Sequence, residues 1–137
     1  MRIMAIDYGD VRTGIAVSDA TATLAGEAWV IEERSPARLC DKIAVEAKNR
    51  GVATLVLGHP KNMDGSLGPR AEKAEALANR LRALELEVVL WDERRTSVEA
   101  HAILSEQGRR GKKRKERVDA VAATLILEAY LRKNALS

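Results

Sequence analysis

Residues 3–19 read IMAIDYGDVRTGIAVSD, and this stretch decides the fold. A short apolar run ends at the carboxylate of Asp7, a turn bordered by Gly9 and Gly14 follows, and a second apolar run leads away. This pattern predicts two strands joined as a hairpin. Asp is a poor strand residue, so an acid at the end of a strand is either a turn former or a functional group.

The rest of the chain alternates between predicted strands and helices. Including the hairpin, strands are expected at residues 2–8, 14–19, 28–31, 53–57 and 87–91. Helices are expected at residues 36–50, 71–84, 96–107 and 116–133. Three strands, then alternating helix and strand, then two helices favour an α/β fold with a mixed sheet and helices on both faces.

Size and composition narrow the class of protein. The 137 residues suit a single domain spanning residues 1–137. The one cysteine, Cys40, excludes an internal disulfide and a cysteine-based zinc site. Aromatic residues are only 3% of the chain, which argues against an aromatic platform for stacking bases. No apolar run reaches the length of a membrane span and no signal peptide is evident, so we expect a cytoplasmic protein without membrane contact.

The positive charge is concentrated in one segment. The formal net charge is +3, but residues 109–117 read RRGKKRKER and carry seven basic residues and one acid. The segment is either a solvated loop or a contact for a nucleic-acid backbone, and its charge density favours nucleic acid as the partner. The candidate contacts are Arg109, Arg110, Lys112, Lys113, Arg114 and Lys115.

Three acidic residues lie at positions where active sites commonly form in α/β folds. Asp7 and Glu93 each follow a predicted strand, and Asp119 begins the uncharged part of the last helix. Sites in open α/β sheets form beyond the carboxyl ends of parallel strands, so Asp7 and Glu93 should share one rim. Asp119 could reach that rim from a helix packed on the sheet, or it could simply favour the helix N-terminus.

Clustered carboxylates repel one another unless a cation lies between them. Hard oxygen ligands suit Mg²⁺ or Mn²⁺, and two such ions can activate water and stabilise the leaving oxygen in phosphodiester hydrolysis. We therefore predict Asp7, Glu93 and Asp119 as metal ligands and catalytic residues. They would hold one or two ions, and this chemistry favours two.

Four motifs make the chain similar to the YqgF family, also called RuvX. They are residues 6–19 (IDYGDVRTGIAVSD), 58–66 (GHPKNMDGS), 92–100 (DERRTSVEA) and 118–131 (VDAVAATLILEAYL), and the resemblance spans the whole chain. The family consists of small bacterial proteins with an RNase H-like fold, described as Holliday junction resolvase-like and as pre-16S rRNA nucleases. The resemblance implies a three-layer fold with strand order 3-2-1-4-5. It also places the family's catalytic acids on Asp7, Glu93 and Asp119.

The resemblance implies a metal-dependent endonuclease that processes the 5′ end of pre-16S rRNA in ribosome biogenesis. One alternative is a resolvase of four-way DNA junctions, which would need a homodimer for two symmetric cuts. Another is a non-catalytic RNA-binding factor in ribosome assembly. A phosphate-transfer domain of the sugar kinase and actin type has a similar opening hairpin, but 137 residues leave no room for its second domain.

Individual positions in the motifs carry further expectations. We count Arg12 and Arg94, which lie in the first and third motifs, among the nucleic-acid contacts. His59 stands where the family usually has leucine. It is either an incidental loop histidine or a functional group that acts as a base or contacts phosphate. Strand order 3-2-1-4-5 separates Asp7 from Glu93 by two strands, roughly 10 Å of backbone, so we expect the acids to look too far apart without metal.

Overall fold

The computed structural model describes residues 1–62, 64–93 and 111–135, and their side chains except those of residues 111–119. The strands are β1 (Arg2–Asp7), β2 (Arg12–Ser18), β3 (Ala25–Glu32), β4 (Val52–His59) and β5 (Glu87–Asp92). The helices are α1 (Pro36–Arg50), α2 (Pro69–Ala83) and α4 (Gly111–Ala135). Within the described part of the chain, no helix is long and apolar enough to cross a membrane.

The five strands form one mixed sheet in the order β3-β2-β1-β4-β5, which confirms the predicted order. β1 pairs antiparallel with β2, and β2 pairs antiparallel with β3. β1 pairs parallel with β4, and β4 pairs parallel with β5. The carboxyl ends of β1, β4 and β5 therefore meet at the same edge of the sheet, as the placement of acids after β1 and β5 predicted.

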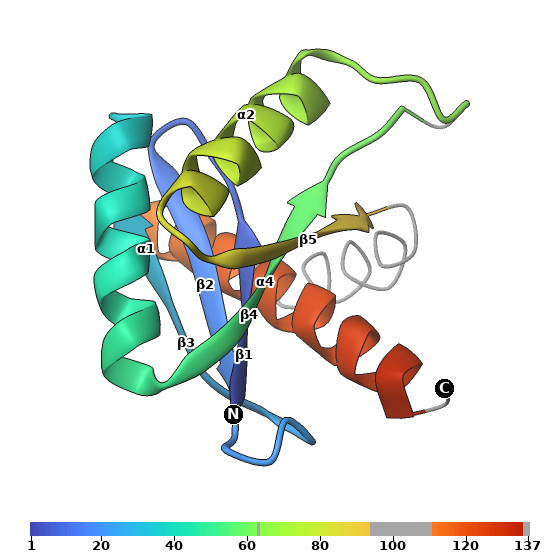
Figure 1. Cartoon of the computed structure of the whole chain (residues 1–137). Coiled ribbons are helices and arrows are strands. Elements are labelled where there is room, and N and C mark those ends of the chain that lie inside the picture. Colours follow the sequence, from blue (N-terminus) through green and yellow to red (C-terminus); the bar gives the residue numbers. More distant parts are fainter. Residues whose placement is uncertain (63, 94–110, 136–137) are drawn as a thin grey trace.

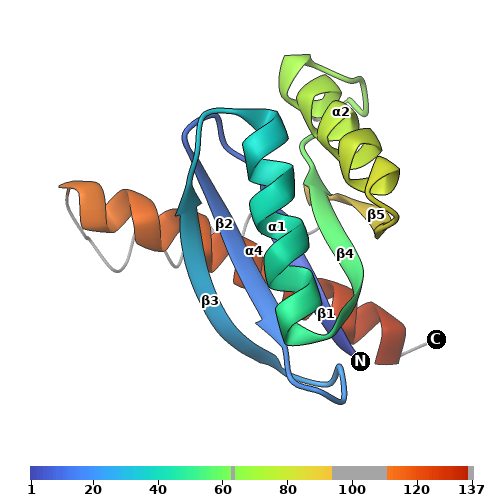
Figure 2. The same ribbon diagram turned by 60° about the vertical axis from the view of Figure 1, so that its left-hand side comes forward.

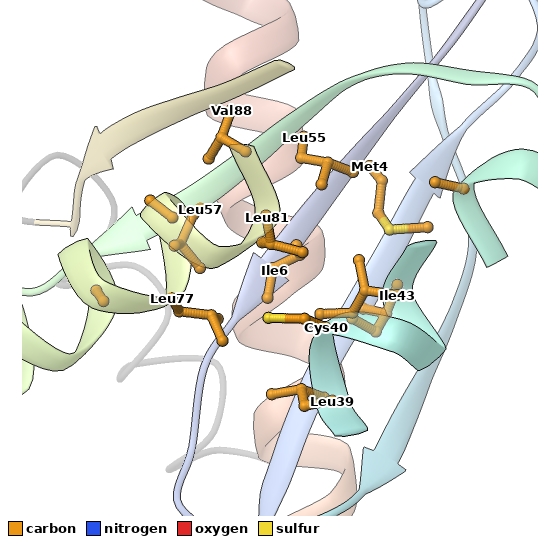
Figure 3. Close-up of a cluster of buried hydrophobic side chains, with 14 of the residues drawn as sticks. Met4, Ile6, Leu39, Cys40, Ile43, Leu55, Leu57, Leu77, Leu81 and Val88 are labelled. Atoms are coloured by element: carbon orange, nitrogen blue, oxygen red, sulfur yellow. The ribbon is translucent and has the colours of Figure 1, made fainter. Parts of the chain in front are cut away.

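Helices cover both faces of the sheet (Figures 1 and 2). On one face, α1 and α2 pack against side chains of the central strands, and Figure 3 shows this cluster around Met4, Ile6, Leu55 and Leu57. On the other face, α4 packs against small side chains such as Ala5 and Ala16. Each fully buried Leu or Ile stabilises the fold by about 1.5–3 kcal/mol, so the two layers together hold the strand ends rigidly.

Two predicted boundaries were wrong by three residues or more. β3 begins at Ala25 and not at Ala28, because the backbone of Ala25 pairs with Ser18 although residues 25–27 resemble a turn. α4 begins at Gly111 and not near Glu116, so the basic segment is helical from residue 111 onward and is not a loop there. Lys, Arg and Glu are good helix formers, which explains the longer helix. The helix expected at residues 96–107 lies outside the described residues.

Candidate active site

Asp7 and Glu93 lie at the shared edge of the parallel strands. Asp7 is the last residue of β1, and Glu93 directly follows β5. In the sheet register, Ile6 is level with Leu57 and Gly58 is level with Trp91. Both carboxyl side chains are half-buried. The strand β4 separates their backbones, as the strand order requires.

Gly58 of β4 lets the two acids meet. Glu93 lies two residues beyond Trp91, on the same face of β5, and its carboxyl group folds back over Gly58. A Cβ atom at Gly58 would lie 2.9 Å from Cδ of Glu93 and 3.1 Å from Cδ1 of Ile126 in α4. The absence of a side chain at this position therefore opens the path from β5 to β1.

The carboxyl groups of Asp7 and Glu93 are hydrogen-bonded to each other. The expectation that these two acids stand too far apart without metal was wrong, because it counted strand spacing and not the room above a glycine. A hydrogen bond between two carboxyl groups needs one shared proton. Two carboxylates this close cannot both be ionised without a neighbouring cation.

The pKa of Glu93 is raised above the ordinary value of a glutamic acid. Burial is the largest cause, because desolvation disfavours the carboxylate. The hydrogen bond to Asp7 and the nearby guanidinium of Arg70 act in the opposite direction and lower the pKa. Glu93 is thus held in a position where charge is costly unless positive charge is supplied.

The acids form one wall of a pocket of about 220 Å³. The opposite wall comes from α2 and includes Arg70 and Lys73. Asp10, in the turn between β1 and β2, joins the two sides, because its Oδ1 lies 3.0 Å from Nζ of Lys73. The pocket thus presents carboxylates on one side and cations on the other.

Sequence reasoning missed the residues of the opposite wall. Arg70 and Lys73 stand three positions apart at the head of a predicted helix, so they share one face, and this spacing was the available signal. Tyr8 also lines the pocket, where burial and the Asp10 carboxylate raise the pKa of its phenol. Tyr8 therefore stays protonated and offers an O–H donor.

The third predicted acid, Asp119, lies in α4 one helical turn before Ala123, which is fully buried against the sheet. Its side chain lies outside the described part of the structure. Among the described side chains, no three His, Cys, Asp or Glu residues are grouped closely enough to hold a metal ion. The described metal-ligand candidates are therefore the pair Asp7 and Glu93.

The predicted basic contacts fall into three groups. Arg12 begins β2, and one of its guanidinium nitrogens lies 4.0 Å from Oε1 of Glu32, with 24% of the side chain exposed. Lys112, Lys113, Arg114 and Lys115 belong to the first turns of α4, and their side chains lie outside the described part. Arg94, Arg109 and Arg110 lie outside the described residues altogether.

His59 does not line the pocket of the acids. It ends β4, its side chain is only 8% exposed, and its Nε2 atom lies 3.7 Å from Oε1 of Glu75 in α2. Among the residues that the structure describes, Nε2 has no hydrogen-bond partner. This placement favours the interpretation of His59 as a packing residue and not as a phosphate contact.

Sequence comparison relates the chain to one family along nearly its whole length. The profile of the family described as "RuvX: Holliday junction resolvase" matches residues 1–133. A protein of Halothermothrix orenii named "Putative pre-16S rRNA nuclease" is 44% identical over 132 residues, which cover 96% of this chain and 94% of that protein. A protein of Pelotomaculum thermopropionicum with the same name is 42% identical, and the match covers 96% of this chain and 86% of that protein.

Solved structures with the same fold include junction resolvases. The RuvC protein of T. thermophilus in complex with a Holliday junction substrate matches with a TM-score of 0.60 at 14% identity, over 98% of this chain and 96% of that one. The yeast mitochondrial Holliday junction resolvase Ydc2 matches with a TM-score of 0.62 at 11% identity, over 97% and 78% of the two chains. At these identities the likeness shows the fold.

Proposed function

The chain belongs to the RuvX family, and we propose that it is a nuclease that hydrolyses phosphodiester bonds in structured nucleic acid with divalent metal ions. The observation that carries the proposal is the hydrogen-bonded pair of Asp7 and Glu93 in a pocket at the carboxyl ends of the parallel strands. We propose residues 1–137 as one nuclease domain, and the packing of the described helices and strands on one sheet supports this.

The acid pair fits a divalent cation. Its four carboxylate oxygens are hard ligands of the kind that Mg²⁺ and Mn²⁺ prefer, and a cation can replace the proton that the pair otherwise shares. Asp7 and Glu93 would hold the metal, together with Asp119 from α4. When bound, such ions supply an activated water and charge for the leaving oxygen.

The residues of the chain have separate roles in this reaction. Asp7 and Glu93 fix the reacting centre relative to the sheet, because a paired strand leads into each of them. Asp7 itself pairs with Gly14, and Asp92, the residue before Glu93, pairs with His59. Asp119 completes the ligand set from the opposite layer. The basic residues at 109–117, together with Arg12 and Arg94, bind the nucleic-acid backbone and bring it to the acids.

The substrate that we propose is the precursor of 16S rRNA, cut near its 5′ end. The choice of this RNA rests on the names of relatives that are 44% and 42% identical to this chain, and the choice of the 5′ end rests on the family resemblance of the sequence. The alternative substrate is a four-way DNA junction, which the description of the family profile favours. A resolvase cuts two strands symmetrically and would act as a homodimer.

One experiment separates these possibilities. The purified protein is incubated with Mg²⁺ or Mn²⁺ and either a precursor rRNA fragment or a four-way DNA junction, and the products are resolved on a denaturing gel. We expect metal-dependent cleavage of the rRNA fragment near the mature 5′ end and none with the Asp7→Asn variant. Equal cleavage by this variant would overturn the site, and cleavage of the junction alone would select the resolvase.

A non-catalytic RNA-binding factor makes a different prediction in the same experiment. Such a factor would bind the rRNA fragment in a salt-sensitive manner but would leave it intact with either metal. The acid pair argues against this alternative, because binding an anionic backbone does not need two carboxyl groups in contact, one of them desolvated.

A further inference from the structure

The pocket wall opposite the acids carries two cations that the proposed mechanism has not used. Arg70 and Lys73 lie three residues apart in the first turns of α2, so they project from one face of the helix. Both line the same pocket as Asp7 and Glu93. They belong to a different element from the basic segment at 109–117, which is part of α4 from Gly111 onward.

Contacts and pocket lining place both cations beside the acids. The Nζ atom of Lys73 lies 3.0 Å from Oδ1 of Asp10, and both residues line the pocket. Arg70 lines the same pocket together with Asp7 and Glu93. Positive charge is therefore present in the pocket where a ligand of the acids would lie.

Lys73 has a partner that a ligand can replace. Its ammonium contacts Asp10, and the two side chains are 56% and 76% exposed. An ion pair this exposed is weak, because water and salt screen it. A phosphate could therefore take the place of the Asp10 carboxylate at little cost. The freed Asp10 would remain hydrated.

We propose that Arg70 and Lys73 bind a backbone phosphate of the nucleic acid beside the bond that is cut, with Lys73 exchanging the Asp10 carboxylate for that phosphate. The inference rests on the proposed nuclease function and assigns a second contact surface to the same site. The two acids repel an anionic backbone, so positive charge on the opposite wall of the pocket would offset this repulsion. A guanidinium can bind phosphate with two hydrogen bonds, and an ammonium binds it as a point charge.

The test measures binding without turnover, in the Asp7→Asn background and with EDTA. Fluorescence anisotropy gives the Kd for a fluorescein-labelled RNA duplex and a four-way DNA junction over a range of salt concentrations. Adding Arg70→Ala and Lys73→Ala should weaken binding about tenfold at 0.1 M salt. It should also make the slope of log K against log salt shallower by about 1–2, since each lost phosphate contact removes roughly 0.9.

Lys48→Ala with Arg132→Ala is the matched control. It removes the same charges from exposed positions near the ends of α1 and α4, away from the pocket. We expect a change in Kd within about twofold and an unchanged salt slope. An unchanged slope in the Arg70 and Lys73 variant would overturn the inference, as would an equal loss in the control.

Asp10→Asn tests the exchange itself. If the Asp10 carboxylate competes with phosphate for Lys73, this variant should bind about two- to fivefold more tightly, and the gain should vanish when Lys73 is also Ala. A lower Tm with unchanged binding would mean that the pair only braces the fold and would overturn the exchange. Cleavage by the wild-type protein is measured separately, so failure of the nuclease function is distinguishable from failure of this inference.

Discussion

The two walls of the pocket carry different kinds of side chain. Asp7 and Glu93 have short side chains at strand ends, half-buried and hydrogen-bonded to each other. Arg70 and Lys73 have long side chains on the exposed face of α2. The difference follows from their tasks: groups that align reacting atoms need a fixed position, whereas groups that attract a phosphate backbone tolerate side-chain motion.

The largest expected effect on the cleavage rate comes from lengthening the side chain at residue 7 by one methylene group. Asp7→Glu keeps the charge, but its longer side chain cannot fit the same contact with Glu93, so cleavage should fall by about 10²–10³-fold. Lys73→Arg makes a comparable change of length on the other wall, and its cleavage rate should stay within about threefold of the wild-type rate. Single-turnover cleavage rates check both variants. A nearly unchanged rate in Asp7→Glu, or a large loss in Lys73→Arg, would contradict the difference between the two walls.

Gly58→Ala displaces the other acid without altering any charge. The new methyl group would lie 2.9 Å from Cδ of Glu93, so the carboxyl group must move away from Asp7. Cleavage should fall by about 10–10²-fold, since an error of about 1 Å can cost that much. Gly68→Ala is the control, because its nearest contact would be an ordinary 3.4 Å from Oδ1 of Asn62. Full activity of Gly58→Ala would show that the path over β4 is unimportant.

The sequence predicted those features of the site that depend on local patterns of residues, and it did not predict those that depend on the packing of distant strands. The strand order and the shared edge of Asp7 and Glu93 were predictable, because apolar runs and the acids that end them are local patterns. Their direct contact was not predictable, because it depends on an empty volume above Gly58 that arises only when β4 lies between β1 and β5.

The other wall was missed for a related reason. Arg70 and Lys73 look like ordinary solvent-facing residues of an amphipathic helix, and only the folded chain shows that they line the same pocket as the acids. The start of α4 was missed because a run of like charges was interpreted as a loop, although Lys and Arg have high helix propensity.

The raised pKa of Glu93 predicts a pH effect on stability. The folded state holds the Glu93 proton more tightly than the unfolded state. This stabilisation is therefore present below 4.5, the ordinary pKa of glutamic acid, and is lost as pH rises through the higher pKa of the folded state. In EDTA, Glu93→Gln should match the wild-type Tm near pH 4. At neutral pH its Tm should be higher by a few degrees.

Thermal unfolding at several pH values, with and without Mg²⁺, measures this effect. Glu128→Gln, at an exposed position of α4, is the control and should show no pH-dependent difference from the wild type. Mg²⁺ should raise the Tm of the wild type more than that of Glu93→Gln, because the cation stabilises the ionised pair. A difference between Glu93→Gln and wild type that is the same at all pH values would contradict the assignment.

The smallest effect is expected at His59, the last residue of β4. Its Nε2 atom is buried without a hydrogen-bond partner among the described residues, so replacing the ring with an apolar side chain removes a desolvation cost. His59→Leu should raise the free energy of unfolding by about 1 kcal/mol and leave cleavage unchanged. Urea unfolding and a cleavage assay check this, with His59→Gln as the polar control. A loss of cleavage would contradict this prediction and would mean that His59 contacts the substrate, as proposed for Arg70 and Lys73.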